Sequence, residues 1–125
     1  MAGLRGIPLL DWIPGRSWRV VATVEAADEI PDKLPAKGAV LVGSPEHPKW
    51  LAFDCPCKTG HRIMVTLDRA HYPHWTLHNS KKLTISPSID YISPERRCHY
   101  LVRGGKVFWV KEKEKRRGRK RKTNR

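Results

Sequence analysis

Cysteine is scarce in this 125-residue chain, which contains only three, at positions 55, 57 and 98. An odd number cannot form a complete set of intramolecular disulfides, which argues against a small secreted domain held together by such bonds. Cysteines that act as metal ligands in a reducing compartment fit the composition better. We therefore expect a cytoplasmic protein.

Long hydrophobic runs are also missing. No stretch approaches the roughly 20 apolar residues that are needed to span a bilayer. The N-terminal segment MAGLRGIPLLDWIPG has a short apolar patch, but it lacks a long hydrophobic region and a small-residue cleavage site. We therefore expect neither a signal peptide nor a membrane partner.

Acidic residues are few: 12 Asp and Glu stand against 25 Lys and Arg, which gives a net charge of +13. Residues 111–125 carry ten of the basic residues and two Glu, so +8 of that charge lies in the last segment. This segment has no apolar residue to bury, and we expect it to be a disordered basic tail behind a folded domain of residues 1–110. Such a tail would attract polyanions, so non-specific contact with nucleic acid is one expected interaction.

The remaining sequence predicts a mainly β fold. Short β-rich segments are separated by Pro and Gly turns, and they lie at 18–25, 39–43, 49–56, 61–68, 74–79, 81–89 and 98–110. Apolar residues alternate at Ile63, Val65 and Leu67, as expected for a strand with one buried face. Gly104-Gly105 is a good hairpin turn, because both glycines tolerate a positive φ. We expect a small antiparallel β-sheet domain with one or two short helices, stabilised by a structural zinc.

The zinc prediction depends on the pattern of Cys and His residues. Cys55, Cys57 and Cys98 supply three thiolates, and Gly60 allows a turn that brings His61 back to the metal. Four protein ligands would close the site, as in structural zinc centres. Two alternatives remain: three buried cysteines without a metal, or an open catalytic zinc site in which His61 is not a ligand.

A second polar group of residues suggests nucleophilic chemistry. Cys98 and His99 are neighbours in a probable strand, so their side chains point to opposite faces, and His99 is left free if Cys98 binds the metal. Ser88 lies eleven residues before His99, within reach across one loop, and Asp90 could orient the imidazole. On spacing alone, Ser86-Pro87-Ser88 is more simply explained as a turn. The histidines at 47, 71, 74 and 78 are expected at the surface or in loops.

Three motifs together, FDCPCKTGHRI, HWTLHNSKKLTISPSIDY and RRCHYLVRGGKVFW, resemble a family of small bacterial proteins. It is the BubE peptidase family of bacterial ubiquitination-like (Bub) operons. The resemblance runs in order from about residue 20 to about residue 110. Lys58-Thr59-Gly60 stands where many relatives carry a further cysteine, and Cys98 is adjacent to His99 where many relatives place it three residues earlier.

The resemblance implies a zinc-stabilised β fold that works as a serine protease on ubiquitin-like proteins. Carried over, Ser88 is the nucleophile of the Pro-Ser-Ile motif and His99 is the base of the Cys-His-Tyr motif. Cys55 and Cys57 match the Cys-Pro-Cys metal motif. The implied partners are a bacterial ubiquitin-like substrate and its activating and conjugating enzymes, which are similar to E1 and E2.

Two other functions remain compatible with the sequence. One is a non-catalytic zinc β module that binds nucleic acid or a partner in the conjugation pathway through its basic tail. The other is a zinc hydrolase with an open metal site.

Overall fold

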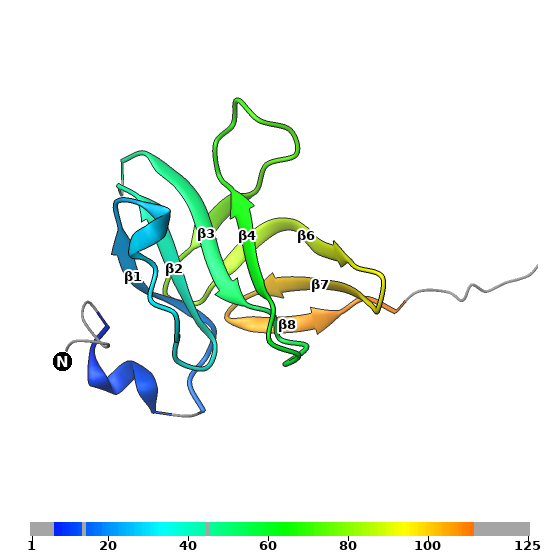
Figure 1. Ribbon diagram of the computed structural model, residues 1–125, viewed down its shortest axis with the longest axis horizontal. Coiled ribbons are helices and arrows are strands. Elements are labelled where there is room, and N and C mark those ends of the chain that lie inside the picture. Colours follow the sequence, from blue (N-terminus) through cyan, green and yellow to red (C-terminus); the bar gives the residue numbers. More distant parts are fainter. Residues whose placement is uncertain (1–6, 14, 45, 112–125) are drawn as a thin grey trace, which may run out of the picture.

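The computed structural model describes residues 7–13, 15–44 and 46–111, which form two four-stranded sheets (Figure 1). The strands of the first sheet are β1 (Arg19–Val24), β2 (Gly38–Gly43), β3 (Pro48–Asp54) and β4 (Arg62–Thr66). Those of the second sheet are β5 (Thr76–Asn79), β6 (Thr84–Ile92), β7 (Arg97–Arg103) and β8 (Lys106–Trp109). Two short 3₁₀ helices are present, η2 (Leu9–Trp12) and η3 (Ala27–Glu29). The prediction of a mainly β fold is confirmed.

In each sheet the strands lie in sequence order, and every pair but one is antiparallel. The exception is β1 with β2, which run parallel. Parallel neighbours need a long crossover connection. Residues 25–37, which contain η3 and the Pro-rich stretch, provide it. The sequence prediction of antiparallel pairing did not include this crossover.

The main core lies between the two sheets, whose strands run across each other in Figure 1. Its largest fully buried side chains include Phe53 from β3 and Tyr100 from β7. Trp18 meets Phe53 edge to face, with ring centroids 5.7 Å apart. Alternate residues of β4 and β7 face this core, so the period-two pattern in the sequence reports the buried face of each strand.

A smaller apolar cluster covers the other face of the first sheet. It consists of Ile7, Val21, Leu34 and Val40. Because this cluster lies on one face of β2 and the main core on the other, residues 38–42 are all buried. This explains why AVLVG reads as a continuous apolar run and not as an alternating one.

Two local features of the second sheet shape the functional region. Gly104 and Gly105 have φ values of 61° and 77° and join β7 to β8, as the hairpin prediction requires. In β6, Ile85 pairs with Val102 but Ile89 pairs with Tyr100, so β6 contains two extra residues at this point. The extra length lies in Ser86-Pro87-Ser88, and we call this segment the β6 bulge.

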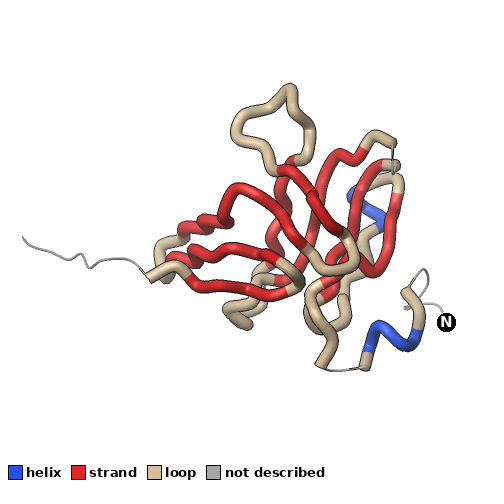
Figure 2. Tube along the Cα trace, turned by 180° about the vertical axis from the view of Figure 1, so that it is seen from behind, coloured by secondary structure: helices blue, strands red, loops and turns tan. Residues whose placement is uncertain are grey.

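Around this framework, the loop 67–75 projects away from both sheets (Figure 2). Among the described residues, no helix is long and apolar enough to cross a bilayer. Apart from Lys111, the predicted basic tail lies outside the described residues, and the domain boundary at 110 stays a prediction.

Candidate functional site

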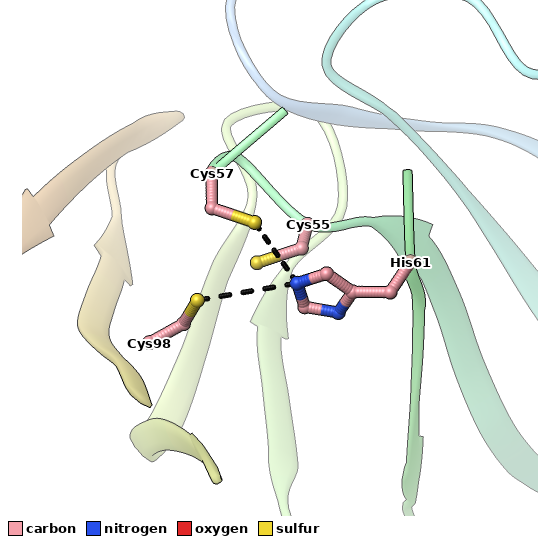
Figure 3. Close-up of side chains that lie close together, drawn as sticks. All are labelled: Cys55, Cys57, His61 and Cys98. Carbon is pink, nitrogen blue, oxygen red and sulfur yellow. Dashed lines mark hydrogen bonds between the residues drawn. The ribbon is translucent and has the colours of Figure 1, made fainter. Parts of the chain in front are cut away.

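The four predicted metal ligands come together in one cluster (Figure 3). The donor atoms of Cys55, Cys57, His61 and Cys98 all lie within 4.8 Å of one another. Nε2 of His61 is 2.9 Å from Sγ of Cys57 and 3.9 Å from Sγ of Cys98. Residues 37 positions apart in the chain thus meet at one point, which only the packing of the two sheets achieves.

A tight turn after β3 aims three of these side chains. The N–H of Lys58 donates to the C=O of Cys55 at 3.1 Å and closes the turn around Pro56. The N–H of Cys55 donates to the C=O of His61 at 3.0 Å, which returns the chain to β4. The fourth member, Cys98, faces inward from β7 and is 1% exposed. One local loop and one distant strand therefore build the cluster.

The size and chemistry of the cluster fit zinc. Tetrahedral zinc holds sulfur ligands at about 2.3 Å and nitrogen ligands at about 2.0–2.1 Å, so ligand atoms lie about 3.6–3.8 Å apart. The two His61 distances, 2.9 and 3.9 Å, fall on either side of this value. Three thiols and one imidazole are a usual structural zinc set. These residues could hold one metal ion with little rearrangement.

Burial and mutual contact perturb the three thiols. Burial raises the pKa of Cys98 to about 12, and the neighbouring Cys57 and Cys55 add to the shift. Burial also raises the pKa of Cys55. At Cys57, burial acts in the same direction, but hydrogen bonds from Thr59, Cys55 and His61 outweigh it and lower the pKa to about 6. Two of the thiols therefore resist ionisation, and a cation that binds them as thiolates would have to offset this cost.

Two aromatic side chains connect the cluster to the second sheet. The ring of Tyr91 in β6 stacks on His61, with centroids 4.3 Å apart and planes at 22°. The hydroxyl of Tyr100 in β7 lies 3.5 Å from Sγ of Cys55. Nδ1 of His61 is buried without a hydrogen-bond partner among the described residues. The cluster is thus packed directly against the strands that carry Ser88 and His99.

Ser88 and His99 also meet. Oγ of Ser88 lies 3.1 Å from Nε2 of His99, so the hydroxyl can donate to the imidazole. The N–H of the Trp75 indole donates to the C=O of Ser88 at 3.3 Å and holds the β6 bulge from the β5 side. Both members of the Ser–His pair are half-buried. Nucleophile and base at hydrogen-bonding distance form the minimal unit of serine catalysis.

Asp90, the residue predicted to orient the imidazole, lies directly across from His99 in the β6–β7 ladder. Its carboxylate accepts two hydrogen bonds from Arg97, both at 2.8 Å. The Arg97 guanidinium lowers the pKa of Asp90, and the charge of His99 adds to this effect. Asp90 is therefore an ionised group beside His99.

A second Ser–His pair lies on the same bulge. Oγ of Ser86 is 2.8 Å from Nε2 of His78 in β5. The sequence placed His78 among the surface histidines, and it is exposed, but the pairing with Ser86 was not foreseen. The contact could have been predicted by treating HWTLHNSKKLTIS as a β-hairpin, because residues on the same face of neighbouring strands lie close together. Ser86 and Ser88 thus have different histidine partners, on opposite sides of β6.

The family assignment comes from comparison with known proteins. A family model described as "Bacterial ubiquitination-like system serine protease (BubE)" matches residues 26–110. Searches of curated proteins and of solved structures give no significant match. The matched residues include the metal cluster and both Ser–His pairs, and they make up more than half of the chain. The resemblance seen in the motifs is confirmed: the chain belongs to the BubE family of serine proteases of bacterial ubiquitination-like systems.

Proposed function

We propose that this chain is a serine peptidase that removes a C-terminal extension or a conjugated target from a bacterial ubiquitin-like protein. The observation that carries the proposal is the distance of 3.1 Å between Ser88 Oγ and His99 Nε2, in a chain of this family. The activating and conjugating enzymes of the same pathway are the expected further partners. The expected compartment is the cytoplasm.

In the proposed mechanism, Ser88 Oγ attacks the carbonyl carbon of the scissile bond while Nε2 of His99 accepts its proton. The same imidazolium then donates that proton to the leaving nitrogen as the acyl-enzyme forms. A water molecule, deprotonated by His99, hydrolyses the acyl-enzyme and regenerates the Ser88 hydroxyl. The negative charge of Asp90 favours the imidazolium that exists between these proton transfers.

The cluster of Cys55, Cys57, His61 and Cys98 would help to fix the strands that carry Ser88 and His99. Cys98 and His99 are consecutive in β7, so fixing the Cys98 side chain on the core face also fixes the backbone from which His99 projects. Tyr91 gives β6 a similar contact with His61. Zinc bound by Cys55, Cys57, His61 and Cys98 would supply a structural link between the loop after β3 and the second sheet. We assign it no part in the reaction itself.

The zinc hydrolase alternative is less well supported. Catalytic zinc sites keep one position for water, whereas four protein donors converge here. The nucleic-acid alternative depends on the basic tail, which lies almost wholly outside the described residues. Neither alternative accounts for the Ser88–His99 pair.

The experiment is cleavage of a ubiquitin-like precursor that carries a C-terminal extension. Ser88→Ala and His99→Ala should each reduce kcat/KM by at least about a thousandfold, and the double variant should be no worse than either, because the two residues act as a unit. A fluorophosphonate probe should label Ser88 in the wild type and fail to label Ser88→Ala.

Ser86→Ala and His78→Ala are the matched controls, because this pair has the same chemistry on the same bulge. They should retain most of the activity, and all four variants should keep their metal. If Ser88→Ala cuts at the wild-type rate while Ser86→Ala does not, the nucleophile has been assigned to the wrong pair. If chelation alone abolishes cleavage by a Ser88→Ala enzyme that is otherwise active, the zinc hydrolase becomes the better explanation.

A further inference from the structure

A groove of about 910 Å³ lies on a different part of the molecule from the Ser88–His99 pair. Three segments form its walls: the turn before β2, the loop that carries the first metal ligands, and the start of β8. Neither Ser88 nor His99 lines it. Its volume is near the upper end of the range of about 300–1,000 Å³ that is typical of ligand pockets.

The rim of the groove is positively charged. Lys37, Lys58 and Lys106 line it, all three are exposed, and none forms an ion pair within the described part of the chain. Two carboxylates also line the groove: Asp54, which forms an ion pair with Arg62 at 2.9 Å, and Asp32, which is exposed. With Arg62, four cationic side chains of the lining stand against these two carboxylates. The groove therefore presents three lysines whose charge is available to a ligand.

Two of these lysines have an unusual backbone conformation. Lys37 and Lys58 have φ values of 63° and 65°, and they are the only residues other than glycine with positive φ among those described. Each sits in a tight turn, closed by the N–H of Gly38 in one case and by the N–H of Lys58 itself in the other. Glycine would occupy these positions at a lower energetic cost. Residues held in this region of φ/ψ space concentrate at functional sites, and both of these lysines face the same groove.

The third wall suggests the shape of the ligand. Lys106 and Val107 belong to β8, the outermost strand of the second sheet (Figure 1). Among the described residues no strand pairs with its outer edge, and Phe108 and Trp109 are 48% and 50% exposed. An open edge of this kind can accept an extended peptide as an added strand. A nucleotide is less well suited, because Trp18, the one aromatic residue of the groove, is 7% exposed and packed against Phe53.

We propose that this groove binds an extended acidic segment of a partner protein, which adds to the outer edge of β8 and pairs its carboxylates with Lys37, Lys58 and Lys106. The chain's own basic tail is a poor occupant, because it carries the same sign of charge as the rim. The proposal does not depend on Ser88 being a nucleophile, because the groove and the Ser–His pair share no residue.

The test uses the full chain and a fluorescein-labelled (Val-Glu)4 peptide, with binding measured by fluorescence anisotropy. The double variant Lys37→Gly, Lys58→Gly should weaken binding about tenfold, as expected for two surface charge pairs. Its melting temperature should be equal to or higher than that of the wild type, because glycine adopts a positive φ at both positions without the steric strain of a Cβ. Lys106→Glu should weaken binding to a similar extent. Lys106 lies in a regular strand, so this variant changes the charge of the groove without altering either turn.

The control double variant is Lys49→Gln, Lys81→Gln, which removes the same charge outside the groove. An equal loss of binding in this control would mean attraction to the overall charge and would overturn the proposal. Displacement of the peptide by ADP at comparable concentration would assign the groove to nucleotides instead. A (Val-Glu)4 peptide with alternate backbone nitrogens methylated should not bind, and undiminished binding would exclude strand addition to β8.

Discussion

At the scale of single residues, the charges around His99 bear on the role of base that we propose for it. Asp90 faces it across the ladder and is held ionised by Arg97. Two unit charges about 6 Å apart interact by about 0.7 kcal/mol in water and by about 3 kcal/mol at an effective dielectric constant near 20. Asp90 is exposed and His99 is half-buried, so their interaction falls between these limits, and Asp90 should matter for the proposed catalysis without being indispensable.

Asp90→Asn should therefore lower kcat about tenfold, far less than His99→Ala, because it removes the negative charge but keeps the shape of the side chain. Steady-state kinetics with the ubiquitin-like precursor give the comparison. Arg97→Gln is the control, since it breaks the ion pair and leaves Asp90 in place. An Asp90→Asn enzyme with unchanged kcat would remove Asp90 from the catalytic unit.

The same ion pair has a consequence for pH. The pKa of Asp90 is lowered in the folded protein, so its contribution to stability is present above its unfolded pKa of about 3.9 and disappears as the pH falls through the lowered value. In Arg97→Gln the Asp90 pKa returns towards its ordinary value, because the largest cause of the shift is gone. Acid unfolding monitored by circular dichroism should then begin at a higher pH than in the wild type.

At the scale of elements, a metal bound by Cys55, Cys57, His61 and Cys98 would join a loop of the first sheet to a strand of the second. Cys55 and Cys98 enclose more than 40 residues of chain. Closing a loop of that length with metal restricts the unfolded chain considerably. A small domain buries only about two-thirds of its unfolded surface, so it benefits from such a link.

We expect purified protein to contain one zinc per chain, and Cys98→Ser or chelation to lower the melting temperature by about 10 °C or more. Metal analysis and thermal melts provide the measurements. Thr59→Val is a matched control, because Thr59 contacts Cys57 at 2.9 Å but contributes no metal-binding atom to the cluster. Full metal content and an unchanged melt in Cys98→Ser would exclude Cys98 as a ligand.

The β7–β8 turn offers a second comparison, between adjacent glycines. Both have positive φ, but a Cβ on Gly104 would meet nothing within 4 Å, whereas one on Gly105 would lie 2.9 Å from Cβ of Ser17. Gly104→Ala should cost about 1 kcal/mol for its conformation alone. Gly105→Ala should cost about 2–3 kcal/mol more, because the segment before β1 must also move. Denaturant unfolding of both variants would reveal the difference, and equal costs would contradict the close packing at Ser17.

At the scale of the whole molecule, charge and packing are separated along the chain. The body packs its apolar residues into two clusters, while +8 of the net charge of +13 lies in residues 111–125. The sequence predicts that this last segment contributes to attraction and not to folding, because it has no apolar residue to bury.

Deletion of residues 111–125 should therefore leave the melting temperature within about 2 °C of the full chain, since this segment has no apolar residue to bury. Retention on heparin should fall, because most of the basic charge is gone. The truncated and full-length proteins should cleave the precursor equally well. A large drop in melting temperature would place part of the tail in the folded domain and move the boundary at residue 110.

The sequence by itself determined the properties that follow from local patterns. The β-rich segments, the Gly104-Gly105 turn and the Cys-x-Cys loop depend on neighbouring residues and on alternation, so they could be predicted. Because Cys98 and His99 are consecutive in a strand, their side chains were predicted to lie on opposite faces of the sheet. In the structure, Cys98 belongs to the core cluster and His99 contacts Ser88.

Only the tertiary structure decided what depends on strand pairing and on how the sheets pack. The parallel β1–β2 pair follows from a crossover that no local pattern specifies. The partners of Ser86 and Ser88 depend on the β6 bulge, which adds two residues to β6 opposite β7. Strand alternation by itself would place both serines on the same face, so it could not predict that Ser86 contacts His78 and Ser88 contacts His99. The groove lined by Lys37, Lys58 and Lys106 likewise depends on the tertiary structure. Its walls are the turn before β2, the loop after β3 and the edge strand β8, which are distant in sequence.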